Sequence, residues 1–221
     1  MKVCIAIPIY NEAKAIGDIV EAIRARRLDV VVIDDGSSDG GGVIAQAKGA
    51  AVITHEGRKG KGVSLQDGFG YIVRHGYDGV ITMDGDGQHA VEDLEGFLKK
   101  AEQFPQDIVA GTRMDQCANM PWLRRTTNRF MSWLISLVCK QNIPDTQCGY
   151  RYISRAILQQ IQLTCKDFEI ESEVLIQASR RGFRVHAAPV KTIYRDEKSK
   201  INPLRDTIRF FIYISKEFFR R

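Results

Sequence analysis

The chain has 221 residues, of which 44% are hydrophobic and 27% charged, and a formal net charge of +5. This composition is ordinary for one globular domain with a sizeable core, and it argues against a disordered chain. The cysteines, Cys4, Cys117, Cys139, Cys148 and Cys165, show neither even pairing nor CxxC spacing. We therefore expect reduced thiols in the cytoplasm and no cysteine metal site.

Two continuous apolar runs, residues 2–9 and 29–33, open the chain. Each has the length of a strand and lacks alternation, which predicts strands buried on both faces of a parallel sheet. Residues 12–27 between them carry an apolar stripe at helical spacing, so the unit is β-α-β. The pattern continues with a helix from about residue 39, a strand at 50–54, a helix after Gly60-Lys61-Gly62, a strand before Asp84, a helix at 91–104 and a strand at 107–110.

Polar clusters follow three of these strands, at residues 10–12, 34–35 and 84–88. Ligands of open α/β sheets bind outside the carboxyl ends of the strands. We therefore expect the three clusters to converge on one edge of the sheet.

Asp84-Gly85-Asp86 places two carboxylates one residue apart, beside glycines that let a ligand approach the backbone. Hard cations such as Mg²⁺ or Mn²⁺ take one or two carboxylates together with substrate phosphates, so Asp84 and Asp86 are candidate metal ligands. The alternative is an ordinary Asp-Gly turn. Gly60-Lys61-Gly62 fits neither a Rossmann fingerprint nor a P-loop, and it either presents helix N–H groups to an anion or forms a simple turn.

Four motifs, in this order and spacing, resemble the inverting family 2 glycosyltransferases of GT-A fold: Pro8-Ile9-Tyr10-Asn11-Glu12, Asp34-Asp35-Gly36-Ser37, Asp84-Gly85-Asp86-Gly87-Gln88 and Gly111-Thr112-Arg113. Within that family, the chain is most similar to the polyprenyl-phosphate (dolichyl-phosphate) mannose and glucose synthases. This narrower likeness depends on Asp145-Thr146-Gln147-Cys148-Gly149-Tyr150-Arg151 and on residues 195–200.

The resemblance covers essentially the whole chain and implies an α/β fold of the GT-A type. Such a fold is a Rossmann-like three-layer α/β/α sandwich with a central, mostly parallel sheet. It also implies a single catalytic domain over residues 1–221. Residues 1–113 would form the nucleotide-sugar-binding half, and residues 114–221 the acceptor-binding half with a C-terminal amphipathic helix.

The same likeness assigns roles to single residues. Asp86 would be the direct metal ligand, and Asp84 would lie nearer the ribose or the metal. Gln88 would lie nearer the acceptor or the metal shell, and Arg113 would contact the donor diphosphate or the acceptor phosphate. The candidate catalytic residues are thus Asp86, Gln88 and Arg113. The residues implied to hold the base and ribose are Pro8, Tyr10, Glu12 and Asp35. Core packing is the alternative for Tyr10. A helix or turn cap is the alternative for Asp35, although Asp34 suits that role better.

The acceptor follows from a chemical argument. A hydroxyl nucleophile needs a general base, whereas a phosphate monoester is already ionised and needs only cations around it. Several cations are available: Arg113, Arg124, Arg125, Arg151, Arg195, Lys198 and Lys200. Of these, the resemblance matches Arg124, Arg195 and Lys200 to lipid-phosphate contacts. The chain departs from the synthases at Asn128, where Ser is common, and at Glu197-Lys198, which replaces a glycine-containing turn. Asp145 is the candidate base for a hydroxyl acceptor, or else it caps a turn.

The C-terminal segment is strongly basic, since residues 180–221 hold 12 Lys and Arg against 4 Asp and Glu. Apolar residues are interleaved with these charges, which indicates an amphipathic helix at an anionic membrane surface or a helix packed on its own domain. The longest apolar segment, residues 130–139, is shorter than the roughly 20 residues of a membrane-spanning helix. The resemblance implies that this segment is an interface helix beside the acceptor site, and the alternative is a buried core helix. No nucleic-acid recognition motif accompanies this basic charge. The N-terminus runs straight into the first strand without a signal-peptide pattern, so we do not expect export.

We therefore expect a metal-dependent enzyme that moves a hexose from GDP-mannose or UDP-glucose to a polyprenyl phosphate. It would act as a peripheral protein on the cytoplasmic face of a membrane, or beside a separate membrane protein. Two alternatives remain at this point. One is transfer to a hydroxyl on a glycan or lipid, with Asp145 or another carboxylate as the base, and the other is a catalytically silent membrane-associated binding subunit.

Overall fold

The computed structural model describes residues 1–113, 122–191 and 203–219. Its strands form one seven-stranded sheet. The strands are β1 (Val3–Ile9), β2 (Asp29–Asp34), β3 (Ala51–Thr54), β4 (Gly79–Thr82), β5 (Ile108–Thr112), β6 (Arg151–Ser154) and β7 (Val185–Pro189). The helices are α1 (Ala13–Ala25), α2 (Gly41–Ala47), α3 (Lys61–Arg74), η1 (Val91–Asp93), α4 (Leu94–Gln103), α5 (Trp122–Cys139), α6 (Arg155–Leu158), α7 (Ile170–Arg180) and α8 (Pro203–Phe219).

The strand order is β3-β2-β1-β4-β6-β5-β7. Strand β1 pairs in parallel with β2 and with β4, β2 pairs in parallel with β3, and β5 pairs in parallel with β7. Only β6 runs against its neighbours, β4 and β5. The predicted mostly parallel sheet is confirmed.

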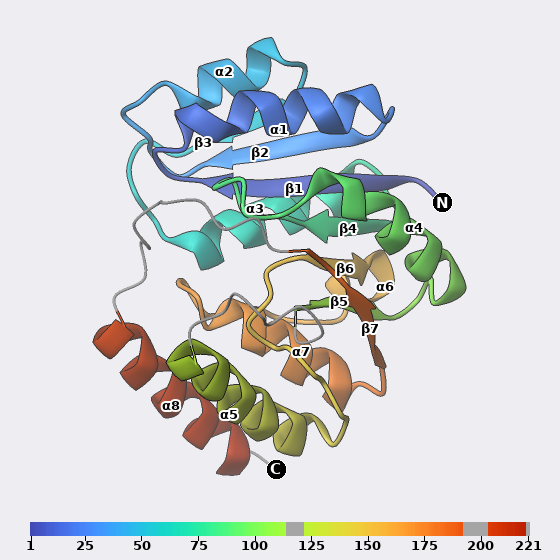
Figure 1. Cartoon of the computed structure of the whole chain (residues 1–221), viewed down its shortest axis with the longest axis vertical. Helices are drawn as coiled ribbons and strands as arrows, with labels where there is room; N and C mark the ends of the chain where they lie inside the picture. Colours follow the sequence, from blue (N-terminus) through green and yellow to red (C-terminus); the bar gives the residue numbers. More distant parts are fainter. Residues whose placement is uncertain (114–121, 192–202, 220–221) are drawn as a thin grey trace.

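The continuous apolar runs predicted burial on both faces, and the two core clusters confirm it. Alternate residues of β1 enter opposite clusters, with Ile5 and Ile7 in one and Cys4 and Ala6 in the other. The first cluster is covered by α1, α2 and α4, whereas the second is covered by α3, α5, α7 and α8. The sheet therefore lies between two helical layers (Figure 1).

Helices α5 and α8 lie side by side at one end of the molecule (Figure 1). Each buries one stripe against the sheet side, through Ile135 on α5 and through Phe210 and Ile214 on α8. The opposite stripes leave large apolar side chains exposed, namely Trp122, Phe130, Trp133 and Leu137 on α5 and Phe211 and Ile212 on α8. Packing on the domain is thus confirmed for one face of each helix, whereas contact of the exposed face with a membrane stays a prediction. Within the described ranges, no helix combines the length and the apolar character that crossing a bilayer requires.

Candidate active site

The polar clusters meet at one edge of the sheet. Because β1, β2 and β4 are parallel, the segments that follow Ile9, Asp34 and Thr82 all emerge at the same edge. Antiparallel β6 begins at Arg151, so the segment 145–150 enters at this edge as well. The predicted convergence is confirmed, and the reversed strand adds a fourth segment to it.

The segments after β1 and β2 are joined by short hydrogen bonds. The Asn11 N–H donates to Ser37 Oγ at 2.9 Å, and the Ser38 N–H donates back to Asn11 Oδ1 at 2.9 Å. Asn11 adopts a positive φ of 54°, a conformation that asparagine tolerates well. Asp34 Oδ1 accepts the Ser37 N–H at 2.8 Å, so Asp34 caps this turn as expected.

Asp35 is buried, with 4% of its surface exposed. Its carboxylate accepts the backbone N–H groups of Lys59 at 2.8 Å and Gly60 at 2.9 Å, and it lies 2.8 Å from His55 Nδ1. The other ring nitrogen of His55 lies 2.9 Å from Asp67. Asp35 therefore caps the loop 55–60. If Asp35 contributes to donor binding with these contacts in place, it does so by positioning this loop.

The other residues implied to hold the donor lie around this loop. Tyr10 is half-buried at the rim, and the Arg58 guanidinium lies 4.5 Å above its ring, so core packing does not describe it. The Glu12 carbonyl accepts the N–H groups of Ala15 and Ile16 in the first turn of α1, each at 3.1 Å. Pro8, at the end of β1, lines a small cavity that Asp84 also lines.

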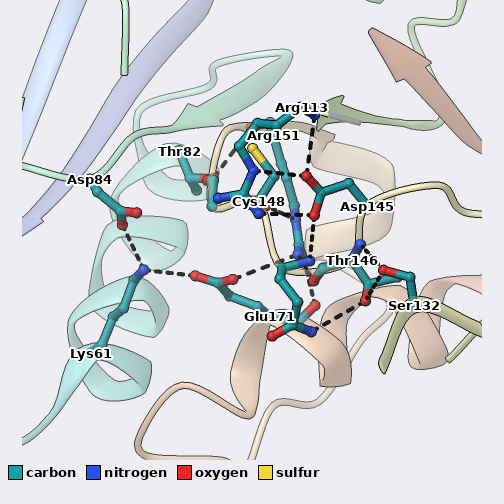
Figure 2. A network of polar contacts seen from close by, with 12 residues as sticks. Lys61, Thr82, Asp84, Arg113, Ser132, Asp145, Thr146, Cys148, Arg151 and Glu171 are labelled. Carbon is teal, nitrogen blue, oxygen red and sulfur yellow. Dashed lines mark hydrogen bonds and ion pairs between the residues drawn. The ribbon is translucent and has the colours of Figure 1, made fainter. Parts of the chain in front are cut away.

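Asp84 is paired with a cation that the sequence pattern did not predict for it. Lys61, the first residue of α3, places its Nζ 2.6 Å from Asp84 Oδ1 and 2.7 Å from Glu171 Oε1 (Figure 2). On the other side of Asp84, His89 Nε2 lies 3.4 Å from Oδ2. Burial opposes ionisation of Asp84, but Lys61 and His89 outweigh it and hold its pKa well below the usual range. Asp84 is therefore a fixed negative charge.

Asp86 has a different environment. Its Oδ1 accepts the Gln88 N–H at 2.9 Å, and among the described residues no other hydrogen bond to its carboxylate is found. Burial, followed by the negative charge of Asp84, raises the pKa of Asp86. A carboxylate with a spare oxygen beside a second negative charge favours an added cation.

Arg113 and Asp145 form a bidentate pair. Arg113 Nε donates to Asp145 Oδ2 at 2.8 Å and Nη2 donates to Oδ1 at 3.0 Å. The backbone N–H groups of Arg113 and Gln147 also donate to this carboxylate, at 3.2 and 3.1 Å. The Asp145 side chain is fully buried and that of Arg113 is 13% exposed. Asp145 thus orients Arg113 at the end of β5.

A buried arginine connects the two sides of the site. Arg151 donates to the carbonyls of Thr146 at 2.7 Å, Cys148 at 2.8 Å and Glu171 at 2.5 Å (Figure 2). Its guanidinium also lies 3.6 Å from the Glu171 carboxylate. A polar network therefore runs from Asp84 through Lys61, Glu171 and Arg151 to the segment that carries Asp145.

Close backbone packing explains the glycines around Lys61. A Cβ on Gly62 would lie 2.4 Å from the Cys165 carbonyl oxygen, and one on Gly60 would lie 2.5 Å from that of Lys166. The N–H groups of both glycines are used within the protein, by Asp35 for Gly60 and by Lys166 O for Gly62. The motif therefore seats Lys61 against segment 165–167, and these two N–H groups are not presented to an anion.

The residues at this edge fit a divalent ion that is shared with a substrate. No group of three or more His, Cys, Asp or Glu suited to a metal occurs in the described parts of the chain. Asp86, with Asp84 nearby, supplies the one or two carboxylates that Mg²⁺ or Mn²⁺ takes when phosphate oxygens complete its shell.

The acceptor side is described less fully. Arg124 lies in α5, but its side chain is outside the described part of the structure, and Arg195 and Lys200 fall in the undescribed range 192–202. Asn128 is buried in α5. The expectations for Arg124, Arg195 and Lys200 therefore remain predictions.

Comparison with known proteins agrees with this architecture. The sequence profile described as glycosyl transferase family 2 matches residues 4–162. The chain belongs to glycosyl transferase family 2. A UDP-N-acetylglucosamine–dolichyl-phosphate N-acetylglucosaminyltransferase of Methanococcus voltae is 29% identical over 86% of this chain and 85% of its own. A polyprenol monophosphomannose synthase of Mycolicibacterium smegmatis is 29% identical over 87% and 77%.

Solved structures give the same fold. Glucosyl-3-phosphoglycerate synthase from Mycobacterium tuberculosis, in complex with Mn²⁺ and UDP-glucose, superposes with a TM-score of 0.74 at 19% identity, over 96% of this chain and 78% of that one. At this identity the likeness concerns the fold alone. The predictions of a family 2 glycosyltransferase and of a GT-A fold are confirmed.

Proposed function

We propose that this family 2 enzyme transfers a hexose, from GDP-mannose or UDP-glucose, to a polyprenyl phosphate with inversion at the sugar. Mg²⁺ or Mn²⁺ would be held by Asp86 together with Asp84. The enzyme would work as a peripheral protein on the cytoplasmic face of a membrane.

The observation that carries the choice of acceptor is the state of Asp145. A hydroxyl acceptor needs a base with a free oxygen in reach of its proton. Asp145, the candidate base, is fully buried and bonded to Arg113 through both oxygens. A phosphate acceptor needs no base, and an oriented arginine suits it.

The metal would stabilise the negative charge that accumulates on the departing diphosphate. The chain's own contribution is positional. Asp84 and Asp86 place two carboxylates at the end of β4. Asp145 holds the Arg113 guanidinium at the end of β5, and β6 lies between these two strands. Arg113 would then bind either the donor diphosphate or the acceptor phosphate.

The relatives support the same acceptor class, since their names place dolichyl phosphate or polyprenol phosphate beside N-acetylglucosamine and mannose. These relatives differ in the sugar that their names give. The choice of GDP-mannose or UDP-glucose as donor therefore rests on the motif resemblance to the mannose and glucose synthases.

The exposed faces of α5 and α8 support a membrane surface as the place of reaction. Trp122 and Trp133 belong to the residue type that settles at the headgroup level. Phe130 and Phe211 are typical of the apolar face of a helix that lies in the membrane interface. The Phe130 and Phe211 rings, from the two helices, lie 6.5 Å apart, so the two faces form one patch. A membrane protein partner could cover this patch instead.

Transfer of radiolabelled sugar tests the proposal. The full chain is incubated with Mn²⁺, a panel of nucleotide sugars, and either a short polyprenyl phosphate or the matching alcohol. We expect product with the phosphate only. Transfer to the alcohol alone would establish the hydroxyl-acceptor alternative, and the absence of transfer and of donor hydrolysis with every sugar would favour a silent binding subunit.

A further inference from the structure

Lys61 occupies the position of a counter-ion at the first aspartate of the Asp84-Gly85-Asp86 motif. Its ammonium lies 2.6 Å from Asp84 and 2.7 Å from Glu171. The side chains are largely buried, with exposed fractions of 18% for Lys61, 30% for Asp84 and 14% for Glu171. Two carboxylates therefore hold the Lys61 ammonium beside the Asp84-Gly85-Asp86 motif.

The geometry leaves little of Asp84 for a second cation. Lys61 covers Oδ1, while Oδ2 faces His89 and lies so near Gly149 that a Cβ there would be 2.9 Å away. A divalent ion binds its oxygen ligands at about 2.0–2.2 Å. An ion at that distance from Asp84 would compete with the Lys61 ammonium for the same carboxylate oxygen. Two cations at that separation also repel strongly in a partly buried site.

Among the described residues, no Lys, Arg or His forms an ion pair with Asp86, so the two aspartates are unequal toward a metal. An incoming diphosphate changes this balance. Its negative charge offers Lys61 a new partner, while Glu171 remains available to keep the ammonium close.

We propose that Lys61 is an internal cation that blocks Asp84 in the donor-free protein, so that a divalent metal binds firmly only together with a nucleotide diphosphate. Glu171 is the second acceptor that keeps Lys61 in reach of Asp84. This inference rests on the metal and donor of the proposed function, but it concerns binding and not transfer.

The test is a titration with Mn²⁺, in which free Mn²⁺ is measured by electron paramagnetic resonance, without nucleotide and with UDP or GDP. The variants are Lys61→Met, Lys61→Arg and Lys59→Met. Lys59→Met is the matched control, because it removes the same charge from an exposed side chain two residues away. Circular dichroism checks that each variant is folded.

Without nucleotide, we expect Lys61→Met to bind Mn²⁺ at least tenfold more tightly than the unaltered chain, with Lys61→Arg and Lys59→Met unchanged. The increase in affinity on adding nucleotide should shrink in Lys61→Met. If Lys61→Met does not fold, Lys61→Gln, which also removes the charge, must show the same gain.

Unchanged Mn²⁺ affinity in the folded charge-removing variant overturns the inference, and so does an equal gain in Lys59→Met. In either case, Mn²⁺ binding by the unaltered chain in the presence of nucleotide would leave the proposed metal-diphosphate site standing. The two ideas therefore fail separately.

Discussion

Removing Asp145 should destabilise the protein because it deletes the carboxylate of a buried ion pair. In Asp145→Ala, the Arg113 side chain, 13% exposed, loses its two hydrogen bonds to this carboxylate, and two backbone N–H groups lose the same acceptor. Breaking a buried ion pair from one side costs about 3–5 kcal/mol. For a chain of this size each kcal/mol lowers Tm by about 2–4 °C, so we expect a fall of about 6–20 °C.

Thermal unfolding followed by circular dichroism measures this directly, with Glu95→Ala as the control. Glu95 pairs with Lys99 across one turn of α4, but both side chains are mostly exposed, and we expect no measurable change. A double variant sharpens the test. Arg113→Met with Asp145→Ala removes both charges of the buried pair and should recover part of the loss. An unchanged Tm in Asp145→Ala, or a double variant that is less stable than both single variants, would refute the reasoning.

Three further predictions concern the metal, the membrane and the acceptor. Because the pKa of Asp86 is raised in the fold, ionisation of this carboxylate destabilises the metal-free protein as pH rises through that pKa. Asp86→Asn should therefore raise Tm at neutral pH in the presence of a chelator, and calorimetry should find that Mn²⁺-dependent nucleotide binding is lost. An unaltered metal dependence would mean that the motif is only a turn. Phe211→Asp should weaken co-sedimentation with anionic vesicles, whereas Val43→Asp, at an exposed position of α2, should not. Equal effects of the two substitutions would count against a specific membrane-binding face. Arg124→Ala and Arg195→Ala should each raise the acceptor KM or lower kcat by about tenfold or more. Donor affinity should change little, because the charge of these arginines acts on the acceptor only. A fall in donor affinity instead would contradict the assignment.

Much of the first half of the fold is predictable from sequence because each element carries its own local signal. Continuous apolar runs give β1 and β2, and the stripe at Ile16, Ile19, Val20 and Ile23 gives α1, whose apolar residues are buried as expected. Strands β6 and β7 carry no comparable signal. They are short, with four and five residues, and β7 is only partly buried, so their place in the sheet depends on tertiary pairing.

The site divides in the same way. The carboxylates at the end of β4 follow from a motif within five residues. Asp34 caps a turn as predicted, and Asp35 caps the loop 55–60, which was the alternative given for it. Lys61 and Glu171 were not predicted as site residues, because their contacts join positions 23 and 110 residues apart. The glycines on both sides of Lys61 were the available signal, since they indicate close backbone approach. Asp145 was predicted as a base or a cap, and only its distance to Arg113 shows its partner.

The reversed strand β6 makes the site intolerant of changes in chain length. Its leading segment is confined on two sides, by Asp84 against Gly149 and by Cys148 against Gly111. Deleting or inserting one residue between positions 145 and 150 would move β6 by one register step, and side chains of a strand change faces with each step. Tyr152, now in the core beneath α1 and α4, would point into the opposite layer. Surface loops in general tolerate insertions and deletions, whereas the register of β6 constrains the length of segment 145–150.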